Sequence, residues 1–325
     1  MIAWVFPGQG SQVVGMGRDL YAQSVAARSL FDQADAILDM PLTRLCFEGP
    51  EAALTATENA QPALLTMSIA LLSALEERSG RPLPVPAAVA GHSLGEYSAL
   101  VAGGALDFAT ALYLVRRRGE LMAEAHEGCM AAVIGIDEQL LDQICDEVSS
   151  ALASYPKSTR TVVVANYNAP GQLVISGSTL AVEQVGQIAR TRGAKRVLPL
   201  KVSSAFHSPL MSSAAEGMAH ALEGVTVRDL SIPLIANVTA EPLRSAKAVR
   251  QEAVAQVVSP VRWIASVQRM AHDGISTFLE LGPGKVLSGL NRRIVPHAQL
   301  LNIGTVEDLL AFNSALLQHP AGHAI

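Results

Sequence analysis

A serine in the stretch GHSLGEYSAL (91–100) has the surroundings that an activated nucleophile needs. Ser93 stands between Gly91 and Gly95 in a G-x-S-x-G pattern, after a short apolar run (85–91) and before a helical segment. In this strand–turn–helix setting the pattern predicts a nucleophile elbow, a strained turn that presents the hydroxyl at the N-terminus of the helix. A glycine-rich turn with a capping serine is the alternative. The strand–turn–helix context favours the nucleophile.

A serine hydroxyl needs a base, and among eight histidines His207 has the most suitable context. It precedes Ser208 and Pro209, residue types preferred at the N-cap and first position of a helix. The dipole of that helix disfavours a protonated imidazole, and a general base must be neutral. The alternative is a loop histidine that only packs. No convincing acid lies between Ser93 and His207, so a weaker group such as a backbone carbonyl is expected to orient the base.

The glycine-rich stretch VFPGQGSQVVGMG (5–17) resembles a dinucleotide-binding loop at first sight. Gly8 and Gly10 fit G-x-G-x-x-G, but Val13 occupies the third glycine position, and the G-K-[ST] of a P-loop is absent. We therefore expect this loop to supply a backbone N–H, that of Gln9, to an oxyanion hole. The N–H of Leu94, the residue after the nucleophile, would be the second donor.

A predicted helix over 107–125, with Asp107 as its N-cap, carries an arginine on its apolar side. Arg118 lies four residues after Leu114 and four before Met122, so its side chain points toward the core. A buried guanidinium keeps its proton and requires an anionic partner. Periodicity alone leaves open whether that partner is a carboxylate of the protein or of a substrate.

Short apolar runs alternate with helical patterns along the chain, which predicts an α/β architecture. The low content of aromatic residues and the many Ala, Val and Leu residues fit helices packed on a mainly parallel sheet. The expected core strands are 2–6, 85–91, 232–237 and 277–281. The expected helices include 61–78, 96–103, 107–125, 209–222 and 260–272.

The order of elements changes between 129 and 200. Apolar runs and helical patterns there follow the sequence β-α-β-β-α-β, with the two middle strands adjacent. This is the ferredoxin-like order. We expect residues 129–200 to form a small domain inserted into a discontinuous catalytic domain, 1–128 and 201–325; a continuation of one sheet is the alternative.

Composition excludes several classes of protein. Half of the 325 residues are hydrophobic and 16% are charged, which argues against disorder. A net charge of −5 without a long basic run argues against nucleic acid as a partner. No apolar segment is long enough for a membrane span, and we expect no signal peptide. Three scattered cysteines without metal-ligand spacing indicate reduced thiols and a cytoplasmic protein.

Nine motifs, in order along nearly the whole chain, resemble the malonyl-CoA:acyl carrier protein transacylases, the acyltransferase family of fatty acid and polyketide synthesis. They are FPGQGSQ (6–12), ENAQPALLT (58–66), GHSLGEYSAL (91–100), RRRGELM (116–122), NYNAPGQLVISG (166–177), AFHSPLM (205–211), NVTAEP (237–242), QVVSPVRW (256–263) and ELGPGKVL (280–287).

The resemblance implies an α/β-hydrolase-like large domain with an inserted ferredoxin-like domain. It implies Ser93 as nucleophile, His207 as base and Arg118 as the group that holds the free malonyl carboxylate. Gln9 and Leu94 would form the oxyanion hole, and the main-chain carbonyl of Gln256 would orient the histidine.

The resemblance also implies the reaction. A malonyl group would pass from malonyl-CoA to Ser93 and then to the phosphopantetheine thiol of an acyl carrier protein, without a metal or bound cofactor. Phe206, with His92 in the expected substrate pocket, favours malonyl, although Ser204 stands where the fuller polyketide signature has His. A fatty acid, polyketide or other malonate-using carrier protein fits the sequence equally well.

Two rival functions remain at this point. A serine hydrolase would use the same elbow with water as acceptor, but a plain esterase has no use for a buried Arg118 beside its nucleophile. A non-catalytic scaffold has no reason to keep Ser93, His207 and Arg118 together.

Overall fold

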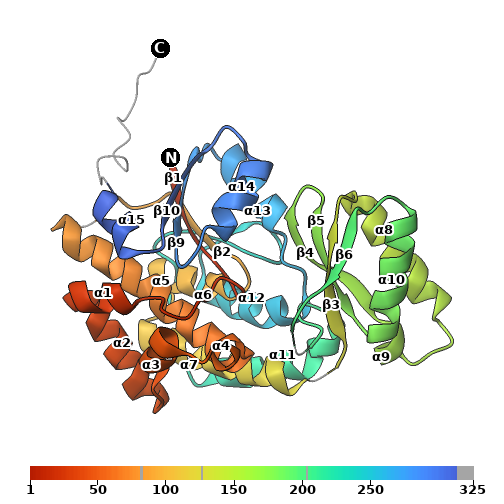
Figure 1. The fold of residues 1–325 in the computed structure, drawn as a ribbon, viewed down its shortest axis with the longest axis horizontal. Helices are drawn as coiled ribbons and strands as arrows, with labels where there is room; N and C mark the ends of the chain where they lie inside the picture. Colours follow the sequence, from red (N-terminus) through yellow and green to blue (C-terminus); the bar gives the residue numbers. More distant parts are fainter. Residues whose placement is uncertain (81–82, 126, 203, 313–325) are drawn as a thin grey trace.

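The protein folds as an α/β structure with two separate sheets (Figure 1). The computed structural model describes residues 1–80, 83–125, 127–202 and 204–312. The larger sheet has the strand order β10-β9-β1-β2-β7-β8. Its strands are β1 (Ile2–Phe6), β2 (Ala88–Gly91), β7 (Leu234–Ile235), β8 (Pro242–Leu243), β9 (Thr277–Leu281) and β10 (Gln299–Ile303).

The first five strands of this sheet are parallel, and only β8 at the edge runs antiparallel to its neighbour. Strand β1 is buried at all five positions, so helices must cover both faces. Trp4 and Phe6 belong to the core that contains α2, α5 and α7, whereas Ala3 and Val5 pack with α13 and α14 on the other face. This alternation follows from the two-residue period of a strand.

The helices of this larger part surround its sheet (Figure 1). They are α1 (Arg18–Gln23), α2 (Val25–Leu38), α3 (Leu42–Glu48), α4 (Glu51–Thr55), α5 (Thr57–Ser79), α6 (Gly95–Ala102), α7 (Phe108–Glu124), the 3-10 turn η1 (Pro209–Met211), α11 (Ser212–Glu223), α12 (Ala246–Val258), α13 (Trp263–His272), α14 (Val286–Ile294) and α15 (Val306–Ala311).

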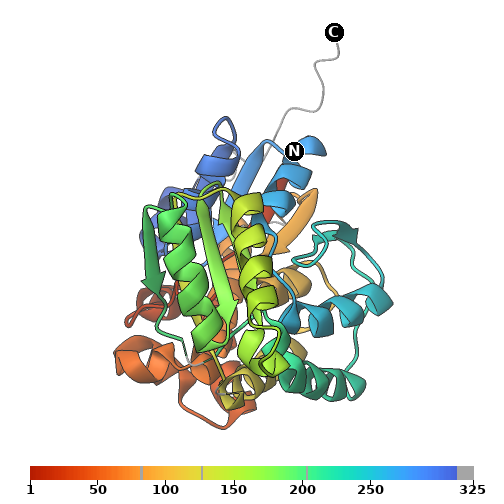
Figure 2. The same cartoon turned by 90° about the vertical axis from the view of Figure 1, so that its right-hand side faces the viewer.

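The second sheet is antiparallel, with the order β4-β5-β3-β6. In chain order this part contains β3 (Cys129–Ile134), α8 (Glu138–Ala151), α9 (Lys157–Arg160), β4 (Val162–Ala169), β5 (Gln172–Gly177), α10 (Thr179–Thr191) and β6 (Arg196–Pro199). Figure 2 shows α8 and α10 side by side on its outer face, and these helices share a separate hydrophobic core with the strands. This is the expected ferredoxin-like arrangement.

We propose that this segment is an inserted domain with boundaries 129–200, and that 1–128 and 201–325 form the discontinuous catalytic domain. The chain enters this segment at the start of β3, at Cys129, and leaves it after the end of β6, at Pro199, so both boundaries lie next to strands of the small sheet. One isolated bridge, between Asn166 of β4 and Val261, joins the strands of the small sheet to the larger part.

The predicted core strands are present, but several boundaries differ. The strand expected over 232–237 contains only Leu234 and Ile235, because Pro233 has no N–H to donate at its start. The helix expected over 61–78 begins four residues earlier, at Thr57, and includes Pro62 in its second turn. The region of 246–258, for which we predicted no element, is the helix α12.

Two further observations bear on the environment of the protein. All three cysteines are free thiols. Among the described residues, none of the helices combines the length and the apolar character that a membrane crossing requires.

Candidate active site

Three neighbouring parallel strands bring the site together at their carboxyl ends. Strand β2 lies between β1 and β7 in the sheet. Gln9 follows β1, Ser93 follows β2 and Asn237 follows β7. Carboxyl ends of parallel strands form one edge of the sheet, where α/β proteins place their binding sites. The loop after β1 therefore lies beside the elbow, as expected for Gln9 and Leu94.

Glycines permit the close approach of these two loops. A side-chain carbon at Gly95 would lie 2.1 Å from the Phe6 carbonyl oxygen, and one at Gly8 would lie 2.4 Å from the carbonyl oxygen of His92. Gly8 therefore allows the loop after β1 to contact the elbow. This contact explains why a glycine stands in a loop that is not a phosphate site. Ser93 itself has φ 50°, the strained left-handed conformation of a nucleophile elbow.

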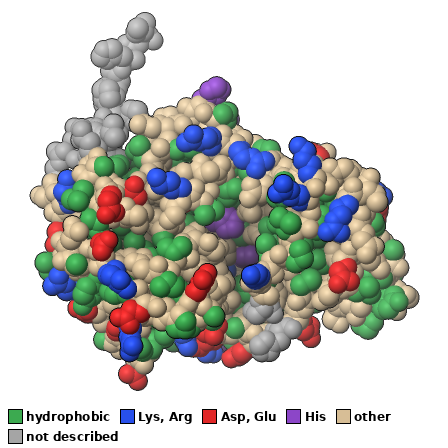
Figure 3. Space-filling model, in the orientation of Figure 1, with side chains coloured by type: hydrophobic (Ala, Val, Ile, Leu, Met, Phe, Trp, Pro, Cys, Tyr) green, Lys and Arg blue, Asp and Glu red, His purple; other side chains and the backbone are tan. Residues whose placement is uncertain are grey.

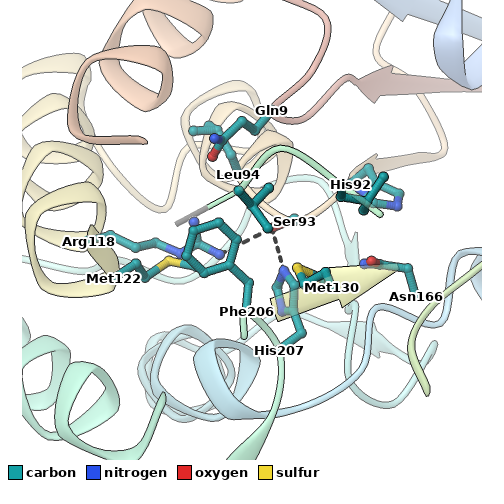
Figure 4. A pocket seen from close by; sticks show the side chains of 12 residues that line it. Gln9, His92, Ser93, Leu94, Arg118, Met122, Met130, Asn166, Phe206 and His207 are labelled. Carbon is teal, nitrogen blue, oxygen red and sulfur yellow. Dashed lines mark hydrogen bonds between the residues drawn. The ribbon is translucent and has the colours of Figure 1, made fainter. Parts of the chain in front are cut away.

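Ser93 and His207 form a hydrogen-bonded pair (Figure 4). The Ser93 Oγ and His207 Nε2 atoms are 2.7 Å apart. The other ring nitrogen, Nδ1, lies 2.9 Å from the Gln256 carbonyl oxygen and 3.2 Å from that of Ser259. Carbonyl oxygens only accept, so Nδ1 carries the proton and Nε2 has a free lone pair toward Ser93. The residue we expected to orient the histidine is thus in contact with it.

Burial keeps the His207 imidazole neutral. It lowers the pKa of His207 to about 3, with the positive charge of Arg118 as the second cause. The helix start that we expected after His207 is present: Ser208 is the N-cap, Pro209 opens the 3-10 turn η1, and α11 follows directly at Ser212. Burial disfavours the imidazolium because the surrounding protein does not replace its hydration; the contribution of the helix dipole stays a prediction.

This pKa predicts a flat pH profile for acylation. Because the folded pKa of His207 lies near 3, the base is already neutral throughout the range from about pH 5 to 8. The single-turnover rate of Ser93 acylation should be constant over this range and fall only at more acidic pH. Rapid-quench mass spectrometry at each pH measures this rate. A decline with its midpoint near about pH 6.5, the value of an exposed histidine, would contradict the burial argument.

Two residues that line the cavity have backbone amides that are unpaired within the described part of the chain. The N–H groups of Gln9 and Leu94 have no hydrogen-bond partner among the described residues, and both residues line the cavity beside Ser93. The Gln9 side chain is held away by donating to the Thr57 hydroxyl oxygen at 3.2 Å. Free amides next to a nucleophile are the donors that an oxyanion hole requires.

Arg118 lies beside the nucleophile, and its side chain is buried. Its residue is 1% exposed, and its guanidinium donates to Ser93 Oγ at 3.2 Å, Gln61 Oε1 at 2.8 Å and Gln256 Oε1 at 2.9 Å. Its Nε has no partner. Among the described residues, no carboxylate forms a salt bridge with it. The guanidinium is thus a buried cation with only neutral partners, which leaves room for an anionic ligand.

A cavity of about 120 Å³ opens at these residues. Figure 3 shows a hollow between the larger part and the small sheet, with histidine side chains visible inside it. Phe206, Met122 and Met130 line the cavity together with Ser93 and Arg118 (Figure 4). This space is smaller than the roughly 300–1,000 Å³ of pockets for drug-sized ligands, so it suits a short acyl group.

His92 lines the cavity as expected but does not face the nucleophile. Its Nε2 lies 2.7 Å from the Oδ1 of Asn168, which is in β4 and in the motif at 166–177. This contact ties the elbow to the small sheet. Among the described residues, no three His, Cys, Asp or Glu side chains gather as a metal site.

Sequence analysis missed the polar residues that support the site. Asn237 accepts from the Ser93 N–H at 2.7 Å and donates to the Gly91 carbonyl oxygen at 2.7 Å, so it holds both sides of the elbow. Gln61 holds Arg118, and Glu96 contacts Asn237 and Gln256. Each lies in a motif that carried the family resemblance, and this was the only signal in the sequence that could have indicated them.

An elbow serine bonded to a buried neutral histidine, on the carboxyl edge of a parallel sheet, defines the class of serine-dependent acyl-transfer enzymes with an α/β fold. Within this class the comparison with known families identifies one family. Residues 3–299 match the family described as the acyl transferase domain, and the chain belongs to it.

Known relatives are similar over almost the whole chain. The malonyl CoA-acyl carrier protein transacylase of Bacillus subtilis is 48% identical over 95% of both chains. That of Escherichia coli K12 is 43% identical over 90% of this chain and 92% of its own. The crystal structure of the acyl carrier protein S-malonyltransferase of Vibrio cholerae has a TM-score of 0.89 at 39% identity, covering 95% of this chain and 99% of its own.

A further similar structure contains a type II polyketide acyl carrier protein in complex with its malonyl transacylase. The matched chain has a TM-score of 0.88 and 39% identity, covering 95% of this chain and 98% of its own.

Proposed function

We propose that this protein transfers a malonyl group from malonyl-CoA to the phosphopantetheine thiol of an acyl carrier protein, through a malonyl ester of Ser93. The observation that carries this proposal is the buried Arg118 guanidinium, which has no carboxylate partner among the described residues and donates to Ser93 Oγ at 3.2 Å. The transacylase relatives support the same reaction.

The first half-reaction forms the ester. His207 Nε2 accepts the Ser93 proton as Oγ bonds to the thioester carbon. The carbonyl oxygen becomes negative, and the N–H groups of Gln9 and Leu94 stabilise it. When the carbon–sulfur bond breaks, the imidazolium returns its proton to the coenzyme A thiolate. The carbonyl oxygens of Gln256 and Ser259 stabilise the transient imidazolium by accepting from Nδ1.

The second half-reaction transfers the malonyl group. The phosphopantetheine thiol gives its proton to His207 and attacks the ester carbon, and Ser93 leaves with that proton. The same base serves both steps, so the mechanism is ping-pong. In each half-reaction His207 accepts one proton and returns it to the leaving group, so the scheme needs no metal or bound cofactor.

Arg118 distinguishes this function from ester hydrolysis. A malonyl carboxylate offers two oxygens to a planar guanidinium, the geometry of a bidentate pair. Burying a cation without an anion costs free energy. A substrate that carries a carboxylate supplies the missing anion and therefore binds favourably beside a buried guanidinium. A plain esterase substrate brings none, and the hydrolase alternative therefore leaves Arg118 unexplained.

The carrier protein is the acceptor that the relatives indicate, since one similar structure holds a transacylase together with an acyl carrier protein. The carrier of fatty acid synthesis, of polyketide synthesis or of another malonate-using complex satisfies the chemistry equally. We place the reaction in the cytoplasm, where thiols such as Cys46, Cys129 and Cys145 stay reduced.

Exposure to malonyl-CoA alone should give a covalent malonyl adduct on Ser93. The elbow supplies the nucleophile and His207 the base, so the ester should accumulate when no acceptor thiol is present. Intact-protein mass spectrometry followed by peptide mapping measures the adduct. The Ser93→Ala variant should remain unmodified under the same conditions. An unchanged mass of the native protein, or an adduct that maps to a cysteine, would overturn the nucleophile assignment.

A further inference from the structure

A buried polar cluster contacts the elbow, and none of its residues lines the cavity. It consists of Glu96 from α6, Gln256 and Glu252 from α12, and Asn237 after β7. Glu96 is 1% exposed and Gln256 is fully buried. The reaction described above uses only the main-chain carbonyl of Gln256, so the side chains of this cluster have no role in it so far.

The side-chain amide of Gln256 joins three parts of the site. Its Oε1 accepts from Arg118 Nη2 at 2.9 Å, and its Nε2 donates to the Ser93 carbonyl oxygen at 3.0 Å and to Glu96 Oε2. Both amide hydrogens and the amide oxygen are thus in use. A rotated amide would place NH₂ against the guanidinium and oxygen against two other oxygens, so only the observed orientation satisfies these partners.

Glu96 is the partner that enforces this orientation. Its Oε1 accepts from the Asn237 backbone N–H at 2.8 Å, and its Oε2 accepts from Gln256 Nε2. Burial and the nearby Glu252 carboxyl raise the pKa of Glu96 well above its usual value. Both oxygens of a carboxyl group retain lone pairs in either protonation state, so Glu96 can serve both donors whether or not it is ionised.

We propose that Glu96 is a positioning residue for malonyl selection: it fixes the Gln256 amide, which presents its oxygen to Arg118 and so holds the guanidinium ready for the malonyl carboxylate. This inference rests on the proposed function. Glu96 touches neither the cavity nor the reacting atoms and acts only through Gln256 and Arg118.

The Glu96→Gln variant reverses the orientation of the Gln256 amide. The backbone N–H of Asn237 cannot rotate, so the new amide must keep its oxygen there and turn its NH₂ toward Gln256. The Gln256 amide then turns its oxygen to that NH₂ and its own NH₂ to the guanidinium of Arg118. Arg118 loses an acceptor and faces a donor, and it should leave its position.

The test compares the specificity constants kcat/KM for loading of malonyl and of acetyl from their coenzyme A thioesters. Glu96→Gln should lower the malonyl-to-acetyl ratio by about tenfold or more, the effect of one hydrogen bond to a charged group, with acetyl loading little changed. Glu280→Gln is the matched control. Glu280 is another buried carboxyl, 1% exposed, which accepts from the backbone N–H groups of Leu287 at 2.9 Å and Ser288 at 2.8 Å and contacts neither Glu96 nor the cavity. Its ratio should equal that of the native protein.

A second variant keeps the proposal testable if Glu96→Gln does not fold. Gln256→Met removes the amide but retains the main-chain carbonyl that orients His207, so it should lower the ratio to a similar extent. The double variant should show no further loss, because Glu96 acts through Gln256.

The outcomes separate this inference from the proposed function. Absence of malonyl loading in the native protein would refute the proposed function. A native protein that prefers malonyl, with an unchanged ratio in Glu96→Gln or in Gln256→Met, would refute the role of Glu96. An equal fall in the ratio of Glu280→Gln would also refute it, since that result assigns the effect to the loss of any buried carboxylate. Additive losses in the double variant would refute it as well, because Glu96 would then act independently of Gln256.

Discussion

Replacement of His207 by alanine should slow the acylation of Ser93 by roughly 10²–10⁴-fold, the usual contribution of a positioned general base. The imidazole is the group whose nitrogen lies 2.7 Å from Ser93 Oγ. Without it, the serine proton has no acceptor at that position. The oxyanion donors and Arg118 remain, which is why some residual acylation is expected.

The measurement is the single-turnover rate of malonyl-Ser93 formation, with circular dichroism to establish that the variant is folded. His220→Ala is a suitable control, because His220 is an exposed histidine on α11 and should not affect the rate. Near-normal acylation in His207→Ala would refute the assignment of the base. It would direct attention to His92, although the Nε2 of His92 is engaged with Asn168.

The candidate catalytic residues could be found in the sequence because their local context is short-range. Ser93 is marked by glycines on both sides and by a strand before it, and His207 by the helix-start signal after it. The inward direction of Arg118 followed from helical spacing, and the structure confirms that its side chain is buried. These features depend on a few neighbouring residues, which a single sequence contains.

The support of the site could not be predicted, because it depends on contacts between distant segments. The hydrogen bond from the Ser93 N–H to Asn237 spans 144 residues, and that from Gln256 to Glu96 spans 160. Nothing in the spacing of Asn237 or Glu96 indicates these partners. For the Gln256 carbonyl, only the family resemblance gave a prediction, since α12 itself was not expected.

The burial of His207 could not be predicted for the same reason. A helix start is visible in the sequence, so the dipole was the available explanation. Burial is a property of the whole fold, and the second cause, the charge of Arg118, comes from a helix 89 residues earlier in the chain. The fold class was predictable because the alternation of strands and helices is repeated along the chain, whereas the two-residue strand β8, which was not predicted, is too short to leave a clear pattern.

Arg118→Ala should abolish most of the preference for malonyl over acetyl. Truncating one member of a buried, hydrogen-bonded charge pair typically costs roughly 2–5 kcal/mol, so malonyl loading should fall by about 30-fold to a few thousandfold. Acetyl has no carboxylate and should lose much less. Acetyl loading should even rise if removal of the unpaired guanidinium, which donates to Ser93 Oγ at 3.2 Å, eases access to the nucleophile.

Arg118→Lys separates charge from geometry. Lysine retains a positive charge but cannot donate two parallel hydrogen bonds to a carboxylate, so it should restore malonyl loading only in part. The neighbouring Arg117→Ala is the matched control: Arg117 is partly exposed and pairs with Glu120 on the same helix, so its loss should not alter acyl preference. Intact-mass measurement of malonyl and acetyl loading in competition gives the ratio for each variant. If the ratio in Arg118→Ala equals that of the native protein, the guanidinium has a structural role, and the malonyl carboxylate must be bound by another group that lines the cavity.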